Sequence, residues 1–397
     1  MPPGNHILKF RAISSLRIFI LLLFVATLAA FGFYYTQSLN LKQNVAHLTA
    51  SESDTKKQLA ATEKELTALK NENQYVVNQE LKAKIKKIET TYKGAQTTYE
   101  KLMDLGLLTK TEKQDELFAE ILSLLAAQNY ASAEGKLTTL TKQIDDELAK
   151  TSPATSIAVN VPVNNTPPGS GYNRQQVKTD IGTFLVDIIS ADLSSTKVIV
   201  DTASDGDCQD NCPTLPLATY VSRNGAFAGV NGSYFCPAEY PSCVGKTNSF
   251  DTLLMNKNKV YFNSDNNVYS TVPAVIFGGG WVRFVGRSLE WGRDTGIDSM
   301  IANQPLVLAG NNVAFGGDGD PKKGSKGSRS FVANKGNTVY IGVVHNATVA
   351  EVGYALKGLG LDNGLNLDSG GSTALWSGGY KAGPGRNIPN AVLFVRK

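Results

Sequence analysis

Histidine is scarce in this sequence of 397 residues, and its scarcity excludes one kind of metal site. The three histidines are His6, His47 and His345, and only His345 lies in the glycine-rich second part of the chain. A zinc centre built from several histidines is therefore excluded in that part.

Several catalytic motifs are absent as well. The sequence has no G-x-S-x-G elbow, no H-E-x-x-H helix and no G-x-x-x-x-G-K-[ST] loop, so serine hydrolase, zincin and P-loop chemistry have no support. The net charge of +4 comes without a dense Lys/Arg stripe interleaved with aromatic residues. We therefore expect no nucleic-acid partner.

Glycine is distributed unevenly. Only five of the 37 glycines lie in residues 1–150, and all cysteines and tryptophans lie beyond residue 200. The first part is compatible with long helices, whereas the second part has the composition of turns and strands.

One long apolar run lies near the N-terminus. Residues 18–35 contain no charge, and Lys9, Arg11 and Arg17 precede them. This pattern predicts a single transmembrane anchor after a basic cytoplasmic tail at residues 1–17, with the rest of the chain outside the cytoplasm. A cleaved signal peptide is the alternative, but no A-x-A site follows the run.

The following segment is expected to be helical. Apolar positions step by four and three through residues 37–106, with a frame slip after Val77, which predicts a coiled-coil stalk and a parallel homodimer. The alternative is a long helix that folds back on the same chain. Residues 112–150 resemble a helical hairpin, and the Ser-, Asn- and Pro-rich residues 151–173 resemble a flexible linker.

Residues 174–397 are long enough for one substantial core. Short β-rich runs alternate with glycine and asparagine turns, and one helix is expected at 349–359, opened by a capping box of Thr348 and Glu351. The expected fold class is α+β, with a mixed sheet and few helices.

The four cysteines form two close pairs in the sequence. In an exported domain they predict disulfides, most simply Cys208–Cys212 and Cys236–Cys243, with a structural zinc site as the alternative. The nearby Asp205, Asp207 and Asp210 resemble part of a calcium loop that lacks its glycine, so a solvated turn is favoured. We expect no metal and no cofactor.

Four turns rich in glycine and small polar residues carry the functional signal. They contain Asn231-Gly-Ser-Tyr-Phe235, Arg329-Ser-Phe331, Asn366-Leu-Asp368-Ser-Gly-Gly-Ser372-Thr373 and Arg386-Asn-Ile-Pro-Asn390. Their order, together with the T-x-x-E helix, resembles the phosphodiester glycosidase family over roughly residues 176–397. The family usually has glycine at the position of Ser369. A side chain there can narrow the pocket, so this difference bears on which substrate is expected and less on the expected reaction.

The residue types also fit the chemistry of a sugar 1-phosphodiester. Asp368 is the candidate carboxylate beside the anomeric carbon, and Arg329 and Arg386 are candidate phosphate clamps. The expected substrate-binding set is Asn231, Gly232, Ser369, Gly370, Gly371 and Ser372. His345 is added as an anion-binding or proton-shuttling residue.

Four of these residues also have a purely structural alternative. Asp368 and Asn231 can brace their own turns, Arg386 can form a structural ion pair, and His345 can be a satisfied buried histidine.

The sequence therefore predicts a membrane-anchored hydrolase that cleaves the C1–O bond of sugar 1-phosphodiesters in cell-envelope or surface glycans. The alternative is a non-catalytic glycan-binding or scaffold module on a coiled-coil stalk.

Overall fold

The structure is a computed structural model that describes residues 8–71, 73–151, 161–264 and 271–397. The contacts divide the chain into two units, residues 1–86 and 87–397. The predicted tail (1–17) and linker (151–173) lie partly outside the described residues. Their boundaries stay predictions.

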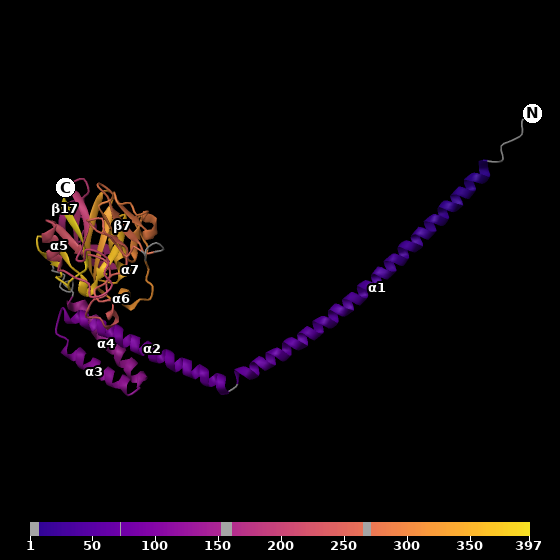
Figure 1. The fold of residues 1–397 in the computed structure, drawn as a ribbon, viewed down its shortest axis with the longest axis horizontal. Helices are drawn as coiled ribbons and strands as arrows, with labels where there is room; N and C mark the ends of the chain where they lie inside the picture. The colour runs from indigo at the N-terminus through magenta and orange to yellow at the C-terminus, as the bar shows by residue number, and fades with distance from the viewer. Residues whose placement is uncertain (1–7, 72, 152–160, 265–270) are drawn as a thin grey trace, which may run out of the picture. The chain divides into compact units, whose positions relative to one another are not determined.

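The first unit is helical. Helix α1 (Leu8–Lys70) continues through the apolar run without a break (Figure 1). The large apolar side chains between Phe19 and Tyr35 are exposed. By length and composition this is the one helix of the described residues that could cross a membrane, a property that anchors and signal sequences share. Helix α2 (Asn73–Gly106) begins just beyond α1, a few residues before the frame slip expected after Val77.

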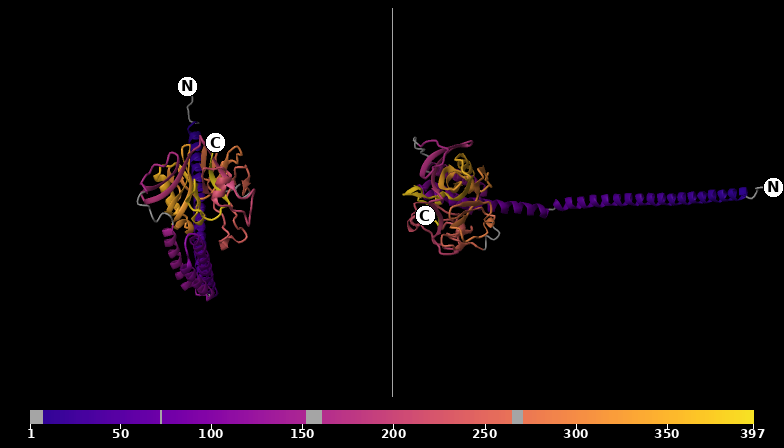
Figure 2. Two further views of the ribbon diagram at one scale, coloured as in Figure 1. Left: turned by 90° about the vertical axis from the view of Figure 1, so that its left-hand side faces the viewer. Right: turned by 90° about the horizontal axis from the view of Figure 1, so that it is seen from above.

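The second unit begins with a bundle of three helices. The C-terminal part of α2 packs against α3 (Glu112–Ala126) and α4 (Tyr130–Thr151) (Figures 1 and 2). Ala95, Leu102 and Leu105 of α2 are buried against Ile121 of α3, and the same cluster includes residues of α4. The end of the apolar seam that predicted a coiled coil is thus covered by helices of the same chain. The parallel homodimer stays a prediction for the seam before residue 87.

Three sheets follow. The first has the order β1-β2-β13-β12-β14-β10-β11, the second β16-β15-β4-β17-β3 and the third β6-β5-β9-β7-β8. The strands of the first sheet are β1 (Gly171–Thr179), β2 (Gly182–Asp192), β10 (Leu306–Ala309), β11 (Asn312–Val313), β12 (Gly327–Lys335), β13 (Thr338–Ala347) and β14 (Asn363–Ser369). Those of the second are β3 (Thr196–Thr202), β4 (Ala228–Asn231), β15 (Leu375–Ser377), β16 (Tyr380–Ala382) and β17 (Asn390–Arg396). Those of the third are β5 (Leu254–Met255), β6 (Tyr261–Phe262), β7 (Ala274–Phe277), β8 (Val282–Val285) and β9 (Ser299–Ala302).

Among residues 161–264 and 271–397 the helices are few and short. They are α5 (Leu217–Arg223), α6 (Pro321–Gly324) and α7 (Val349–Gly358), with 3₁₀ turns at Pro241–Cys243, Ser288–Trp291 and Gly370–Ser372. The capping box of α7 is present, with Thr348 and Glu351 each accepting a backbone N–H of the other. One core lies between the sheets and includes Val230, Val343 and Phe394, and a second lies between the first sheet and α7.

The α+β class is confirmed. Every pairing of the named strands is antiparallel, and a parallel contact occurs at the isolated bridge Val163–Gln176. The expectation of a mixed sheet rested on the strand–helix–strand order at 340–367. Helix α7 does connect two parallel strands, β13 and β14, but β12 lies between them and pairs antiparallel with both.

Candidate active site

Asp368 lies where β14 ends and the 3₁₀ turn Gly370–Ser372 begins. Its Oδ1 accepts the N–H of Ser369 at 2.8 Å, and Ser372 donates a side-chain hydrogen bond to the carboxylate. Gly370 has φ 64°, a conformation that glycine adopts without strain. The hydroxyl of Ser369 donates to Leu367 O at 3.1 Å, so this side chain is directed back to its own strand.

The carboxyl group of Asp368 is closely surrounded by protein, although part of the residue's surface is exposed. Burial raises its pKa to about 6, while Ser372, the N–H of Ser369 and the charge of Arg386 act in the opposite direction. A carboxyl group with this pKa changes its charge near neutral pH, as catalytic carboxyl groups often do.

Asn231 and Gly232 hold the Asp368 turn in place. The fully buried amide of Asn231 donates to Asp368 O at 2.7 Å and accepts from the hydroxyl of Ser330 at 2.7 Å. A Cβ at Gly232 would lie 1.8 Å from Oδ1 of Asn390, so only glycine fits there. The geometry of Asn231 supports the bracing alternative, and a sugar contact of Asn231 or Gly232 stays a prediction.

Arg386 precedes β17 and is 8% exposed. Its Nη2 forms an ion pair with Asp104 at the end of α2, and its guanidinium lies 5.0 Å from the ring centre of Tyr240. The hydroxyl of Tyr240 donates to the other oxygen of Asp104 at 2.7 Å. Burial acts to lower the pKa of Arg386, but Asp104, Tyr240 and Asp368 outweigh it and raise it.

Arg386 and Tyr240 together hold the carboxylate of Asp104, as they could hold another anion at this position. A Cβ on Gly371 would lie 2.8 Å from Oδ1 of Asp104 and 2.5 Å from Nη2 of Arg386, so the glycine lets the acid and the arginine meet over the turn. Burial raises the pKa of Asp104, and Arg386 and Tyr240 offset part of this rise. The Cys236–Cys243 disulfide closes the loop that carries Tyr240.

Arg329 of β12 lies near the same site, and its interactions are structural. Its Nε donates to Ala347 O at 3.0 Å, and its Nη2 donates to the carbonyls of Lys322 and Ser325. Burial lowers the pKa of Arg329, and the negative charges of Asp368 and Asp104 act in the opposite direction. Arg329 is paired with Ser369 across β12 and β14, so it lies beside the Asp368 turn. Its guanidinium donates to backbone carbonyls, whereas that of Arg386 is paired with a carboxylate.

His345 belongs to a buried network beside this site. Its Nε2 lies 2.7 Å from Oδ2 of Asp187, and its Nδ1 lies 3.3 Å from the hydroxyl of Ser328. Tyr172 donates to the other oxygen of Asp187 at 2.7 Å. The side chains of His345 and Asp187 are fully buried, which is the geometry of a satisfied structural histidine. A proton-shuttling role stays a prediction.

Both predicted disulfides are present, Cys208–Cys212 and Cys236–Cys243. In the predicted calcium-like turn, Asp207 accepts the N–H of Asn263 at 2.6 Å and Asp210 that of Thr247 at 2.6 Å. These carboxylates fasten loops. In the part of the chain that the structure describes, no group of three or more His, Cys, Asp or Glu residues could hold a metal ion.

Sequence reasoning missed Asp104 and Tyr240. Asp104 lies in a segment that we interpreted as a stalk, and no local pattern distinguishes it from the other charges of α2. Tyr240 lies between Cys236 and Cys243, and this position is the one feature of the sequence that could have pointed to it.

Comparison with known proteins supports the resemblance inferred from the motifs. Residues 224–395 match the sequence model of the phosphodiester glycosidase family, which confirms the resemblance for that region. No curated protein matches the chain.

Two solved structures show a distant likeness. A hypothetical protein from Synechocystis is 14% identical with a TM-score of 0.46, and the match covers 57% of this chain and 62% of that protein. The zebrafish N-acetylglucosamine-1-phosphodiester alpha-N-acetylglucosaminidase catalytic domain, auto-inhibited by its pro-peptide, is 14% identical with a TM-score of 0.44. That match covers 63% of this chain and 92% of the zebrafish domain. Similarities of this size decide nothing about activity.

Proposed function

We propose that this protein is a membrane-anchored hydrolase that cleaves the C1–O bond of sugar 1-phosphodiesters outside the cytoplasm. In this proposal residues 18–35 span the membrane with the N-terminus inside, and the substrates are glycans of the cell envelope or surface. The observation that carries the proposal is a carboxyl group with a raised pKa, Asp368, beside the buried arginine Arg386. The match of residues 224–395 to the phosphodiester glycosidases supports it.

Hydrolysis of the C1–O bond requires few catalytic groups from the protein. Cleavage breaks the bond between C1 and the bridging oxygen, and the electron pair leaves with a phosphate monoester that needs little proton donation. Water supplies the hydroxyl that ends on C1, and its proton passes to Asp368 or to solvent. Asp368 acts in its ionised form beside the anomeric carbon, and Arg386 holds the departing phosphate.

Asp104 occupies the position on Arg386 that the substrate phosphate needs. Both groups are anions that an arginine can hold, so binding exchanges one for the other. Tyr240 then loses its acceptor on Asp104 and can donate to a phosphate oxygen instead.

A panel of sugar 1-phosphodiesters tests the proposal. The parent protein and Asp368→Asn are incubated with each compound, and released reducing sugar is measured. We expect turnover by the parent and a loss of several orders of magnitude in the variant, because the amide keeps the shape but not the charge. Equal turnover by the two proteins contradicts the proposal.

A non-catalytic glycan-binding module is the second candidate, and one observation favours it. Arg386 and Asp104 are already paired, so the anion site is satisfied without a substrate. If the parent cleaves no member of the panel, this second function becomes the better account.

A further inference from the structure

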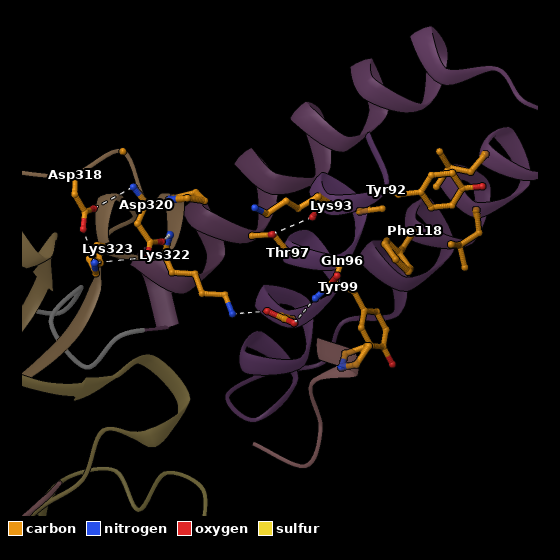
Figure 3. Close-up of a pocket in the computed structure, with 17 residues that line it drawn as sticks. Tyr92, Lys93, Gln96, Thr97, Tyr99, Phe118, Asp318, Asp320, Lys322 and Lys323 are labelled. Atoms are coloured by element: carbon orange, nitrogen blue, oxygen red, sulfur yellow. Dashed lines mark hydrogen bonds and ion pairs between the residues drawn. The ribbon is translucent and has the colours of Figure 1, made fainter. Parts of the chain in front are cut away.

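A groove lies beside the candidate active site and belongs to none of the motifs described above. Its volume is about 1430 Å³, more than a small-molecule pocket needs. One wall is formed by α2 and α3 and the other by residues 318–323 (Figure 3), and Pro241 also lines the groove. The match to the phosphodiester glycosidases does not include the helical wall.

The helical wall presents aromatic rings. Tyr92, Gln96 and Tyr99 are spaced four and three residues apart, so they share one face of α2. Tyr92 is 48% exposed, and Tyr99 and Phe118 pack together with ring centres 5.2 Å apart. Flat apolar rings beside an exposed amide are suited to the apolar faces and hydroxyls of sugar rings.

The charges of the groove balance. The lining contains Lys93, Lys322 and Lys323 on the positive side and Glu100, Asp318 and Asp320 on the negative side. Lys322 pairs with Glu100, and Lys323 pairs with Asp318 (Figure 3). The groove therefore favours an uncharged ligand that forms hydrogen bonds over a polyanion.

The groove lies next to the candidate active site, because residues adjacent to its lining contact Arg386 or Asp104. Glu100 lines the groove, and one helical turn later Asp104 contacts Arg386. Pro241 lines the groove, and its neighbour Tyr240 contacts Asp104. At 1.5 Å per residue, Tyr92 lies roughly 18 Å along α2 from Asp104, enough for several sugar units.

We propose that this groove binds an uncharged glycan chain whose phosphodiester-linked end reaches Arg386 and Asp368. The substrate is then a sugar 1-phosphodiester carried by a polymer. The position of the reactive end rests on the proposed function, whereas binding of the chain in the groove does not.

Binding is measured by titration calorimetry on the full chain in detergent, with Asp368→Asn as the background to prevent turnover. The uncharged probes are the β-1,4-linked tetramer of N-acetylglucosamine and maltotetraose, and a hyaluronan tetrasaccharide is the anionic probe. We expect an uncharged probe to bind more tightly than the anionic one. We expect Tyr92→Ala and Gln96→Ala each to weaken that binding about tenfold, which corresponds to about 1.4 kcal/mol.

Tyr75→Ala is the matched control, because Tyr75 is an exposed tyrosine on the same helix that does not line the groove. It should bind like the parent. The proposal is overturned if neither uncharged probe binds, if the anionic probe binds better, or if Tyr92→Ala and Gln96→Ala bind like Tyr75→Ala.

Kinetics separate this proposal from the proposed function. With Asp368 restored, Tyr92→Ala should raise KM for a glycan-linked phosphodiester about tenfold and leave KM for a small sugar 1-phosphodiester unchanged. Equal effects on both substrates contradict the groove. If the parent cleaves neither substrate, the proposed function fails and the binding experiment alone decides on the groove.

Discussion

The ion pair between Asp104 and Arg386 makes the sharpest prediction about substrate affinity. In Asp104→Asn the amide can still accept the hydroxyl of Tyr240, but the negative charge on Arg386 is lost. A hydrogen bond to a charged group contributes about 1.5–3 kcal/mol. A substrate phosphate that no longer has to displace the Asp104 carboxylate from Arg386 should therefore bind about 10- to 100-fold more tightly. We expect KM to fall by that factor while kcat changes little.

The same change should destabilise the protein without ligand. Removing one partner of a buried ion pair leaves the other charge uncompensated, at a cost of about 3–5 kcal/mol. The Tm of Asp104→Asn should therefore fall, and inorganic phosphate should restore more of it than in the parent, because phosphate replaces the missing anion on Arg386.

The control is Asp145→Asn. Asp145 pairs with Lys101 of α2 at 2.9 Å inside the helical bundle and does not contact Arg386. This variant should lower Tm without lowering KM and without a special response to phosphate. An unchanged KM in Asp104→Asn refutes the competition, and a collapse of its kcat shows instead that Asp104 takes part in the reaction.

Three further predictions concern single groups of the site. Burial raises the pKa of Asp368 to about 6, and in the proposed mechanism its ionised form is the active one. The value of kcat/KM should then be level above that pH and fall tenfold per pH unit below it, and a profile that falls on the alkaline side contradicts this role. Arg386→Lys should raise KM tenfold or more, since lysine cannot form a two-pronged contact with phosphate, and steady-state kinetics with an unchanged KM would remove Arg386 from the phosphate site. Glu351→Gln should leave turnover unchanged and lower the free energy of unfolding by less than about 1 kcal/mol in a thermal melt. The capping box survives this change and only the ion pair with Lys326 is lost, so a loss of activity would contradict a structural role for Glu351.

Local patterns predicted the parts of the fold that local physics determines. The capping box predicted the start of α7, and short β-rich runs between glycine and asparagine turns indicated strands where β2, β13 and β17 lie. The cysteine spacings led to both disulfides. In each case the signal and the structure lie within a few residues of each other.

Long-range packing explains what the sequence left open. The seam of α2 from Ala95 to Leu105 has the same pattern whether a second chain or the hairpin covers it, and here the hairpin does. Asp104 reaches Arg386 from 282 residues away in the sequence, and no local pattern encodes such a contact. The family-like motif around Arg329 indicated a place near the site. It did not indicate that the guanidinium of Arg329 donates its hydrogen bonds to backbone carbonyl groups.

The bond that is broken is the central claim, and hydrolysis in ¹⁸O-labelled water measures it directly. A sugar 1-phosphodiester that the protein cleaves is incubated in the labelled water, and both products are analysed by mass spectrometry. Cleavage at C1–O leaves no ¹⁸O in the phosphate monoester, and this product decides the point because C1 of a free reducing sugar also takes up ¹⁸O by exchange with water. Label in the phosphate instead would show attack at phosphorus and contradict the account of Asp368 and Arg386.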